Sequence, residues 1–294
     1  MITSTLGLAR HGRDHGYAVL AVNVFDDVSL RAVVDAVVAM SSPLVVQVSV
    51  KTVRSIGTGL TTAMFRAAAI AAAVPVALHL DHCPDPDVAA DVVRAGWSSL
   101  LFDASDRDLV TAERETAKIV AMAHASGVDV ESEVENIIGA EDGVGSEISR
   151  HSYPVEMLAA VAERTGADLI APHLGTAHGV YASRPELRPD RARELASLTD
   201  RPLVLHGGTG LTEAEFRAFI NAGVSKINIS TAVKVAYMTA ARNYLAAADA
   251  VGGRDPLAMA AGAGRAISEE VTRHILIFGS EGRAQAASAR GTLR

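Results

Sequence analysis

The stretch 202-PLVLHGGTGLTEAEFRAFINAGVSKINIS-230 contains one complete strand–helix–strand unit. Two short apolar and β-branched runs, 202–206 and 224–229, predict strands. The segment between them, 212–222, carries its apolar residues at helical spacing. Units of this kind are typical of a parallel sheet that is covered by helices.

The same unit recurs along the chain, and eight strand candidates can be counted. They lie at 18–24, 43–49, 75–80, 98–102, 128–133, 167–173, 202–206 and 224–229. Helices between and after them are expected at 28–40, 58–73, 108–126, 154–165, 212–222 and 231–248. Strict alternation over eight units predicts an α/β protein with a closed (β/α)₈ TIM barrel. A doubly wound open sheet is the alternative. We also expect an N-terminal helix before residue 16, which closes the bottom of the barrel, and an extra C-terminal helix at 255–279.

The bulk composition fits one large domain over 1–294. Hydrophobic residues make up 49% of the chain, which is enough for a sizeable core, and no linker divides it. The formal net charge of -7, without a run of Lys or Arg, argues against a nucleic-acid partner. No signal peptide or membrane-helix pattern is found, so we expect a cytoplasmic protein with no membrane partner. The single cysteine, Cys83, excludes an internal disulfide and is interpreted as a small buried apolar residue.

Three histidines stand at the ends of separate predicted strands. His82 lies in 78-LHLDHC-83, His178 in 175-GTAHG-179 and His206 in 203-LVLHGGTG-210. One histidine after a strand is usually a hydrogen-bonding residue, but three at the same rim indicate metal ligands. Three imidazoles that leave a coordination position open are typical of catalytic zinc. The other seven histidines are interpreted as structural or surface residues, although His79 and His173 lie close to the rim.

Further polar residues fall at or just past the strand ends, where barrel enzymes place their active sites. They are Asn23, Ser49, Asp81, Glu133 and Asn228. Asp81 is a candidate proton donor and acceptor. The alternative for Asp81 is that it only orients His82.

Two glycine-rich segments indicate an anion site beside the histidines. In 175-GTAHG-179 and 207-GGTG-210 the backbone can approach an anion closely, and Thr209 offers a hydroxyl. The segment 228-NIST-231 opens a helix whose first amides point outward. Loops after the late strands are where phosphate binds in many barrels of this type.

With these motifs the chain resembles the class II, zinc-dependent ketose-bisphosphate aldolases, which act on fructose and tagatose bisphosphates. The resemblance covers nearly the whole chain. It is carried by YAVLAVNVF, ALHLDHC, AGWSSLLFDAS, GVDVESE, AEDGVG, GTAHGVY, PLVLHGGTGL and AGVSKINIST.

The resemblance implies a role for individual residues. His82, His178 and His206 would bind Zn²⁺, and Glu133 would hold a displaced metal. Asp81 would exchange a proton with the acceptor oxygen, and Glu141 would take a proton from the donor. Dihydroxyacetone phosphate would be the donor, and its enediolate would be stabilised by the zinc. Its phosphate would lie against Gly179, Gly207, Thr209, Ser230 and Thr231, with Asn228 orienting the substrate. The carbonyls of Gly179 and Gly207 would hold a monovalent cation, Na⁺ or K⁺. Relatives form homodimers or homotetramers.

Three segments depart from the family pattern. Relatives usually have a small Gly-Ala segment where this chain has 49-SVKTVRS-55, and an Asp-Pro-Arg where it has 255-DPL-257. The loop after the fifth strand starts with Glu135 and Asn136 instead of Leu-Gly. Leu257 cannot bind an anion. Either Lys51, Arg54 or Arg254 therefore contacts the distal phosphate, or the acceptor aldehyde is not glyceraldehyde 3-phosphate.

Two other functions are alternatives for this sequence. One is a non-catalytic homologue that binds a phosphosugar or stabilises another subunit. The intact set of Asp81 and three histidines counts against it, because a binding protein has no need of an open metal face. The other is a zinc hydrolase of the amidohydrolase kind, which would require a His-x-His pair on the first strand, where this chain reads AVNVF.

Overall fold

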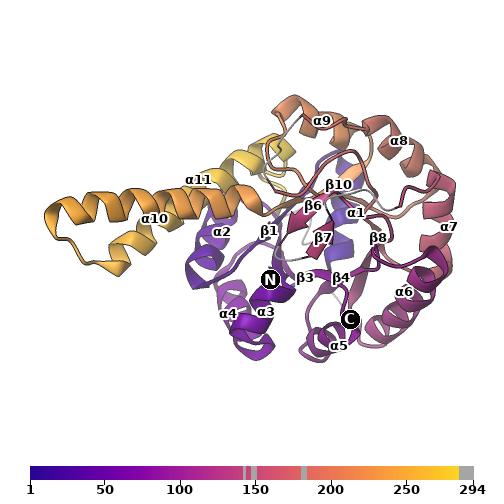
Figure 1. Cartoon of the computed structure of the whole chain (residues 1–294), viewed down its shortest axis with the longest axis horizontal. Coiled ribbons are helices and arrows are strands. Elements are labelled where there is room, and N and C mark those ends of the chain that lie inside the picture. Colours follow the sequence, from indigo (N-terminus) through magenta and orange to yellow (C-terminus); the bar gives the residue numbers. More distant parts are fainter. Residues whose placement is uncertain (142–143, 147–150, 180–183, 285–294) are drawn as a thin grey trace.

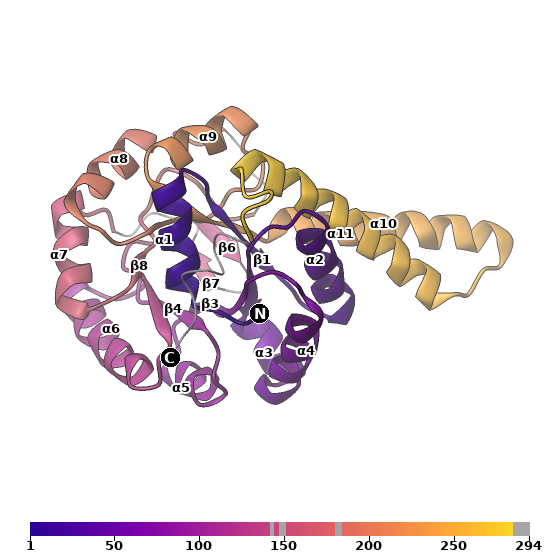
Figure 2. The same cartoon turned by 180° about the vertical axis from the view of Figure 1, so that it is seen from behind.

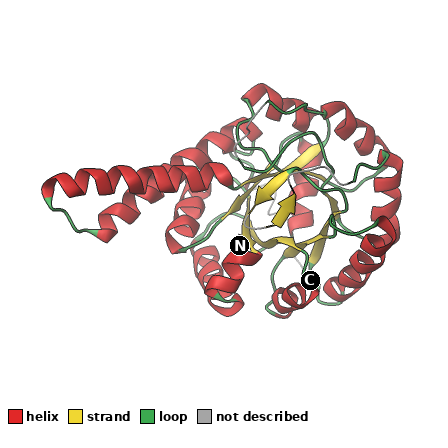
Figure 3. Ribbon diagram, viewed as in Figure 1, coloured by secondary structure: helices red, strands yellow, loops and turns green. Residues whose placement is uncertain are grey.

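The computed structural model describes residues 1–141, 144–146, 151–179 and 184–284. Eight parallel strands form a closed barrel that is ringed by helices (Figure 3). The barrel strands are β1 (Val19–Asn23), β2 (Leu44–Ser49), β3 (Val76–Cys83), β4 (Ser99–Asp103), β5 (Asp129–Glu133), β8 (Leu169–Ile170), β9 (Leu203–Leu205) and β10 (Val224–Ile229). Around the barrel their order is β1-β10-β9-β8-β5-β4-β3-β2. The predicted (β/α)₈ barrel is confirmed, and the open sheet is excluded.

Two strand boundaries differ from the prediction in ways that matter for the site. β3 continues to Cys83, three residues beyond the predicted end, so Asp81 and His82 belong to the strand itself. β8 contains only Leu169 and Ile170 instead of 167–173. Pro172 follows it and has no N–H to donate to a neighbouring strand.

All eight predicted helices are present, and the described chain contains three more that the sequence analysis had not assigned. The predicted ones are α1 (Thr5–His15), α2 (Asp27–Ala39), α4 (Thr58–Ala71), α6 (Leu109–His124), α7 (Val155–Thr165), α9 (Glu213–Asn221), α10 (Thr231–Val251) and α11 (Pro256–Phe278). The additional ones are α3 (Val50–Ile56), α5 (Pro86–Arg94) and α8 (Pro189–Leu198). Their starts are marked locally: Ser49 caps α3, Asp85 caps α5, and a proline opens both α5 and α8.

Helix α1 closes one end of the barrel, as predicted. Its Leu8 packs among the first inward-facing residues of β1, β2 and β3, and its Ala9 packs against β4, β8 and β9. Thr5 shares a hydrogen bond with Ser99 at the start of β4. Figure 2 shows α1 lying across this end. The opposite end, formed by the carboxyl ends of the strands, faces the viewer in Figure 1, behind the short hairpin of β6 (Gly139–Glu141) and β7 (Val144–Ser146).

Helices α10 and α11 form an antiparallel arm that projects from the barrel (Figure 1). Near the barrel, α11 packs against α2, where the Ser268 hydroxyl donates a hydrogen bond to the Ala32 carbonyl (2.9 Å). The extra C-terminal helix predicted at 255–279 is therefore confirmed, and it forms one half of a helical hairpin. No helix of the described chain is long and apolar enough to cross a membrane.

Close to its end, α11 carries a buried histidine. The His274 ring lies against Phe216 and Phe278, with centroid distances of 5.8 and 5.5 Å. Burial, together with the neighbouring Arg273 charge, lowers the pKa of His274 from 6.5 to about 4. The folded protein therefore holds this side chain neutral at pH values where the unfolded chain binds a proton.

We expect His274 to make folding pH-dependent below neutrality. As the pH falls from about 6.5 towards 4, the unfolded chain gains a proton that the folded chain does not, so the free energy of unfolding decreases. The slope for one such group is at most about 1.4 kcal/mol per pH unit. Urea unfolding at pH 7 and at pH 5 measures how much the free energy of unfolding decreases between the two pH values. For His274→Met this decrease should be roughly 1–2 kcal/mol smaller than for the unmodified protein. An equal loss in both proteins would contradict this reading.

Candidate active site

The structure brings the three predicted histidines together at the open end of the barrel. His82 lies near the end of β3, His178 in the loop after β8, and His206 directly after β9. The His82 ring is 4.8 Å from each of the other two rings, which are 6.1 Å from one another. One ring nitrogen of each histidine lies within 4.8 Å of the others. All three side chains are buried.

His82 occupies an unusual backbone conformation. Its φ of 44° is one of only two positive values among the described residues other than glycine. The strand register between β3 and β4 shifts over the same residues, between Leu80 and Cys83. A positive φ at a residue with a bulky side chain is unfavourable and is found most often at functional sites. The irregularity lets Asp81 and His82, which are neighbours in sequence, both reach the site.

Buried carboxylates hold the outer nitrogens of two of the histidines. Nδ1 of His82 lies 3.0 Å from Oδ2 of Asp103, and Nε2 of His206 lies 2.8 Å from Oε1 of Glu131. Burial by itself would raise the pKa of Asp103, but the His82 and Ser105 hydrogen bonds lower it to about 2. Because an ionised carboxylate can only accept, each outer nitrogen must carry the proton. This arrangement fixes the tautomer and the ring orientation of a metal-binding histidine.

The inner nitrogens face one another without protein partners that could satisfy them. Nε2 of His82 and Nδ1 of His206 are 3.0 Å apart. With the outer nitrogens protonated, two neutral rings would present facing lone pairs, so a proton or a metal ion must lie between or beside them. Burial would lower the pKa of His82, but the charges of Asp81 and Glu133 raise it well above its ordinary value, so a proton can take this place when no metal is bound. Both ring nitrogens of His178 are buried and have no hydrogen-bond partner. The donor set therefore fits a divalent metal that accepts imidazole ligands.

A second group of ligands adjoins the first and shares His82 with it. It consists of His82, Asp103 and Glu133. Oε2 of Glu133 accepts no hydrogen bond and lies 3.7 Å from Nδ1 of both His82 and His206. Burial and the nearby Asp103 charge raise the pKa of Glu133 well above its ordinary value. A carboxylate with a free oxygen at this position could bind a cation next to the three histidines.

Asp81 lies beside the histidines but is held by other residues. Its Oδ2 accepts a hydrogen bond from Nδ2 of Asn23 (2.8 Å) and its Oδ1 one from Nε2 of Gln47 (2.9 Å). Burial would raise the pKa of Asp81, but the charges of His82 and His206 lower it, so the group is ionised. Asp103, and not Asp81, makes the hydrogen bond that orients His82.

Beneath the histidines, a buried lysine supports the Glu131 carboxylate. Nζ of Lys226 donates to Oε2 of Glu131 and to Oδ1 of Asn228, both at 2.8 Å. Burial would raise the pKa of Glu131, but the Lys226 charge lowers it. Burial and Lys226 also lower the pKa of the adjacent His79 to about 3, so that His79 is neutral. The ion pair is buried completely and stabilises the negative charge that His206 faces.

The two glycine-rich loops lie against each other at the same rim. Gly207 has a φ of 67°, and a Cβ built on it would be 2.5 Å from the carbonyl oxygen of Ala177. Gly179 also has a positive φ, but the space around its Cβ position is open. Glycine is therefore required at position 207, because a side chain there would clash with Ala177. At position 179, the glycine leaves space that a ligand can occupy.

The loop of Gly207 is also tied to the start of α10. The Thr209 hydroxyl accepts a hydrogen bond from the N–H of Ala232 (3.2 Å). Ser230 precedes α10 and makes no side-chain cap, and its buried hydroxyl has no partner. Thr231 is the first residue of the helix. Free donors at a helix start favour an anion.

Three further residues were predicted to belong to the site: Ser49, Asn228 and Glu141. Ser49 ends β2 directly beside Asp81 in the register of β2 and β3, and its hydroxyl caps α3. Asn228 lies on β10 with its amide nitrogen 3.5 Å from Asp81 and 3.1 Å from His206. Glu141 ends β6, but its side chain lies outside the described part of the structure.

The sequence analysis missed four residues that hold the site together. They are Gln47, Asp103, Glu131 and Lys226. Gln47, Glu131 and Lys226 are polar residues inside apolar strands, each two residues before a recognised site residue. Asp103 had no such signal, because it follows directly after the predicted strand 98–102. Among the described residues, the hydrogen bonds of His173 are made by its backbone. Cys83 forms no disulfide, and burial raises the pKa of its thiol to about 12.

The chain is similar to known aldolases along nearly its whole length. The family model "Fructose-bisphosphate aldolase class-II" matches residues 3–283. A probable fructose-bisphosphate aldolase of Bacillus subtilis (strain 168) is 34% identical, over 96% of this chain and 99% of the relative. A sulfofructosephosphate aldolase of Alkalicoccus urumqiensis is 32% identical, over 92% of this chain and 94% of the relative.

Two solved structures are also similar. The YdjI aldolase from Escherichia coli K12 has a TM-score of 0.84 and 28% identity, and covers 97% of this chain and 100% of its own. A putative fructose-1,6-biphosphate aldolase from Coccidioides immitis has a TM-score of 0.89 and 26% identity, and covers 97% of this chain and 99% of its own.

The hydrogen bond that His82 donates to Asp103 should affect metal binding more than folding. Asp103→Asn keeps the shape but removes the charge that fixes the His82 tautomer. We expect divalent metal to bind about 10–100-fold more weakly, measured by competition with a fluorescent chelator. Asp106→Asn, three residues along the same loop and exposed, is the matched control. Equal affinities of the two variants would show that Asp103 does not orient the ligand.

Proposed function

The chain belongs to the class II fructose-bisphosphate aldolase family, and we propose that its three-histidine centre catalyses the reversible aldol cleavage of a ketose phosphate. As a class II aldolase it is a carbon–carbon lyase. The observation that carries the proposal is the facing pair of imidazole nitrogens, His82 Nε2 and His206 Nδ1, with the Asp81 carboxylate alongside. The pair calls for a cation, and the carboxylate can exchange a proton with a substrate bound there.

In this proposal His82, His178 and His206 bind one Zn²⁺ per chain. When bound, the metal supplies a positive charge that stabilises the enediolate oxygens of the donor, so that no lysine nucleophile is required. Glu133, with its free oxygen, would hold the metal in a displaced position. The carbonyls of Gly179 and Gly207 would hold Na⁺ or K⁺.

The chain's own residues move the protons. Asp81 transfers one to or from the hydroxyl oxygen that becomes the acceptor aldehyde. Asn23 and Gln47 each donate to one of its oxygens, which holds the carboxylate in a single orientation. Glu141 is proposed to take the proton from the donor carbon.

Dihydroxyacetone phosphate is the proposed donor. Its phosphate would lie against the two glycine loops and the start of α10, where it would meet the residues Gly179, Gly207, Thr209, Ser230 and Thr231. The unpartnered Ser230 hydroxyl and the positive end of the α10 dipole support this placement. Asn228 and Ser49, on either side of Asp81, would orient the rest of the substrate.

The acceptor half of the site differs from the family pattern. Leu257 begins α11 on the arm and is 80% exposed, so it provides no charge for a distal phosphate. Arg54 is paired with Asp85 at 2.8 Å. Lys51 lies in the first turn of α3, only two residues after Ser49 at the rim of the barrel. It is therefore the candidate cation nearest in sequence to the site. The acceptor is therefore either glyceraldehyde 3-phosphate with a new contact or a different aldehyde.

A substrate panel distinguishes these acceptors and tests the function. It comprises fructose and tagatose 1,6-bisphosphates, a ketose 1-phosphate, and sulfofructose phosphate, which the name of one relative suggests. We expect zinc-dependent cleavage of at least one, and a loss of about 10²–10⁴-fold in kcat for Asp81→Asn with unchanged metal affinity. Absence of cleavage across the panel, or full activity of Asp81→Asn, would count against the proposal.

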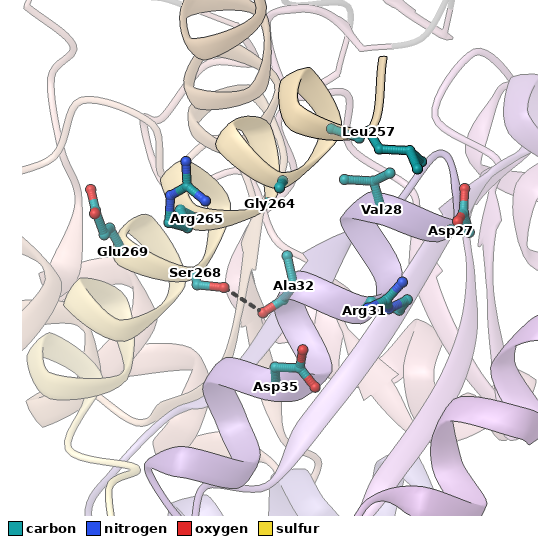
Figure 4. A pocket seen from close by; sticks show the side chains of 12 residues that line it. Asp27, Val28, Arg31, Ala32, Asp35, Leu257, Gly264, Arg265, Ser268 and Glu269 are labelled. Carbon is teal, nitrogen blue, oxygen red and sulfur yellow. Dashed lines mark hydrogen bonds between the residues drawn. The ribbon is translucent and has the colours of Figure 1, made fainter. Parts of the chain in front are cut away.

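We further propose that residues 1–294 form one domain that assembles as a homodimer or homotetramer in the cytoplasm. The arm presents exposed apolar side chains, which on a protein surface indicate an interface. They include Val235, Met238 and Leu245 of α10. A groove of about 680 Å³ runs between α2 and α11, with Val28 and Leu257 at one end (Figure 4). A second copy of this chain is the proposed occupant of these surfaces.

Charges placed on the arm should separate the copies. The double variant Met238→Lys/Leu245→Lys is expected to sediment as a single chain of 30.6 kDa, whereas the unmodified protein sediments as a dimer or tetramer. Leu198→Lys, on an exposed apolar residue of α8 away from the arm, is the control. An unchanged mass of the double variant would place the interface elsewhere.

A further inference from the structure

Away from the histidine cluster, one buried carboxylate collects hydrogen bonds from several parts of the chain. Glu135, two residues after β5, forms a paired contact with Arg191: Nη2 to Oε1 at 2.8 Å and Nη1 to Oε2 at 3.0 Å. The same oxygens accept the backbone N–H of Tyr153 (2.7 Å) and of His173 (3.0 Å). Both charged side chains are at least 95% buried. All four accepting directions of the carboxylate are occupied.

Arg191 extends this contact to the same two backbone segments. It lies in the first turn of α8 and also donates to the carbonyls of Tyr153 and His173. Tyr153 comes just before α7, and His173 follows β8. The ion pair thus joins the chain after β5, the chain before α7 and the chain after β8 to the start of α8.

Two of the joined segments run directly into the active site. Beyond Glu135 the chain reaches Ile138, and beyond His173 it reaches His178. There they meet again, because the N–H of His178 donates to the Ile138 carbonyl at 2.7 Å. Gly139 has a φ of 95°, and a Cβ on it would be 2.6 Å from the His178 carbonyl oxygen. The two segments are therefore fixed together at both ends.

The backbone contact between Ile138 and His178 matters more for the position of His178 than any backbone contact does for His82 or His206. His82 and His206 adjoin strands and have carboxylates on their outer nitrogens, whereas both nitrogens of His178 are without partners. Only its backbone is held. The contacts of that backbone therefore decide where the His178 ring lies.

A purely structural role does not require this chemistry. A buried ion pair can often be replaced by apolar residues of similar volume without loss of stability. Leucine at 135 could fill the space, but it could not accept the N–H groups of Tyr153 and His173. The carboxylate is needed for joining the loops.

We propose that the Glu135–Arg191 pair is a positioning element that fixes the backbone of His178 for metal binding. The inference rests on the proposed role of His178 as a ligand. Neither residue touches substrate or metal. Their effect passes through the backbone contact between Ile138 and His178.

The test compares Glu135→Gln with Glu113→Gln, measuring backbone hydrogen exchange in the metal-free protein and Co²⁺ binding. Glu113 also forms a two-point ion pair, with Arg164 at 2.6 and 2.7 Å, but on the surface between α6 and α7. For Glu135→Gln we expect the His178 amide to exchange at least about tenfold faster, and Co²⁺ to bind about tenfold more weakly with altered visible absorption. Glu113→Gln should change none of these.

A second variant separates positioning from folding. Glu135→Leu/Arg191→Met keeps the buried volume apolar and should fold, yet it should show the same faster exchange and weaker Co²⁺ binding. If this variant folds and shows the same His178 amide exchange and the same Co²⁺ affinity as the unmodified protein, the proposal is wrong. In the unmodified protein the amides of Tyr153, His173 and His178 should open as one unit, and independent opening of His178 would overturn the proposal without any variant.

The outcome can be told apart from failure of the proposed function. If the unmodified protein binds no Co²⁺ at the histidines, the metal site itself is wrong. If it binds Co²⁺ normally and Glu135→Gln does so too, with unchanged exchange, only the positioning role is refuted.

Discussion

The site is organised around two imidazole nitrogens that face each other at 3.0 Å, Nε2 of His82 and Nδ1 of His206. Neither ring can turn away, because Asp103 and Glu131 hold the outer nitrogens. The facing nitrogens therefore need a positive charge between or beside them, either a proton or a metal ion. The surrounding carboxylates increase this need, and the buried Lys226 compensates only part of their charge. A divalent cation satisfies the nitrogens and the carboxylates together.

The barrel supplies the framework that makes such an arrangement possible. Parallel strands bring their carboxyl ends to one rim, and the strand register decides which side chains meet there. Ser49 pairs with Asp81 across β2 and β3, and Asp103 pairs with Glu133 across β4 and β5. Helix α1 fills the other end with apolar residues such as Leu8. The burial of these side chains lowers the local dielectric constant and strengthens the electrostatic interactions at the rim.

Much of this could be predicted from the sequence, since apolar strand runs and strand-end histidines are local signals. The strands and the barrel follow from the spacing of the apolar residues. Glu131 and Lys226 could not be recognised in this way, because a charged residue inside a strand acquires its partner only when distant strands meet. Their parity was nevertheless visible: Glu131 is two residues before Glu133, and Lys226 two before Asn228. The true end of β3, at Cys83, could not be predicted, because the strand continues through the irregular backbone at His82. No sequence pattern indicates such a conformation.

The central claim is that a metal at the three histidines activates a dihydroxyacetone phosphate donor independently of the acceptor. Exchange of deuterium into dihydroxyacetone phosphate, followed by proton NMR with no aldehyde present, tests it most directly. We expect exchange with the zinc-loaded protein and none after chelation, restored when zinc is added back. If the zinc-bound protein gave no exchange, or if exchange persisted without metal, the metal would not activate this donor.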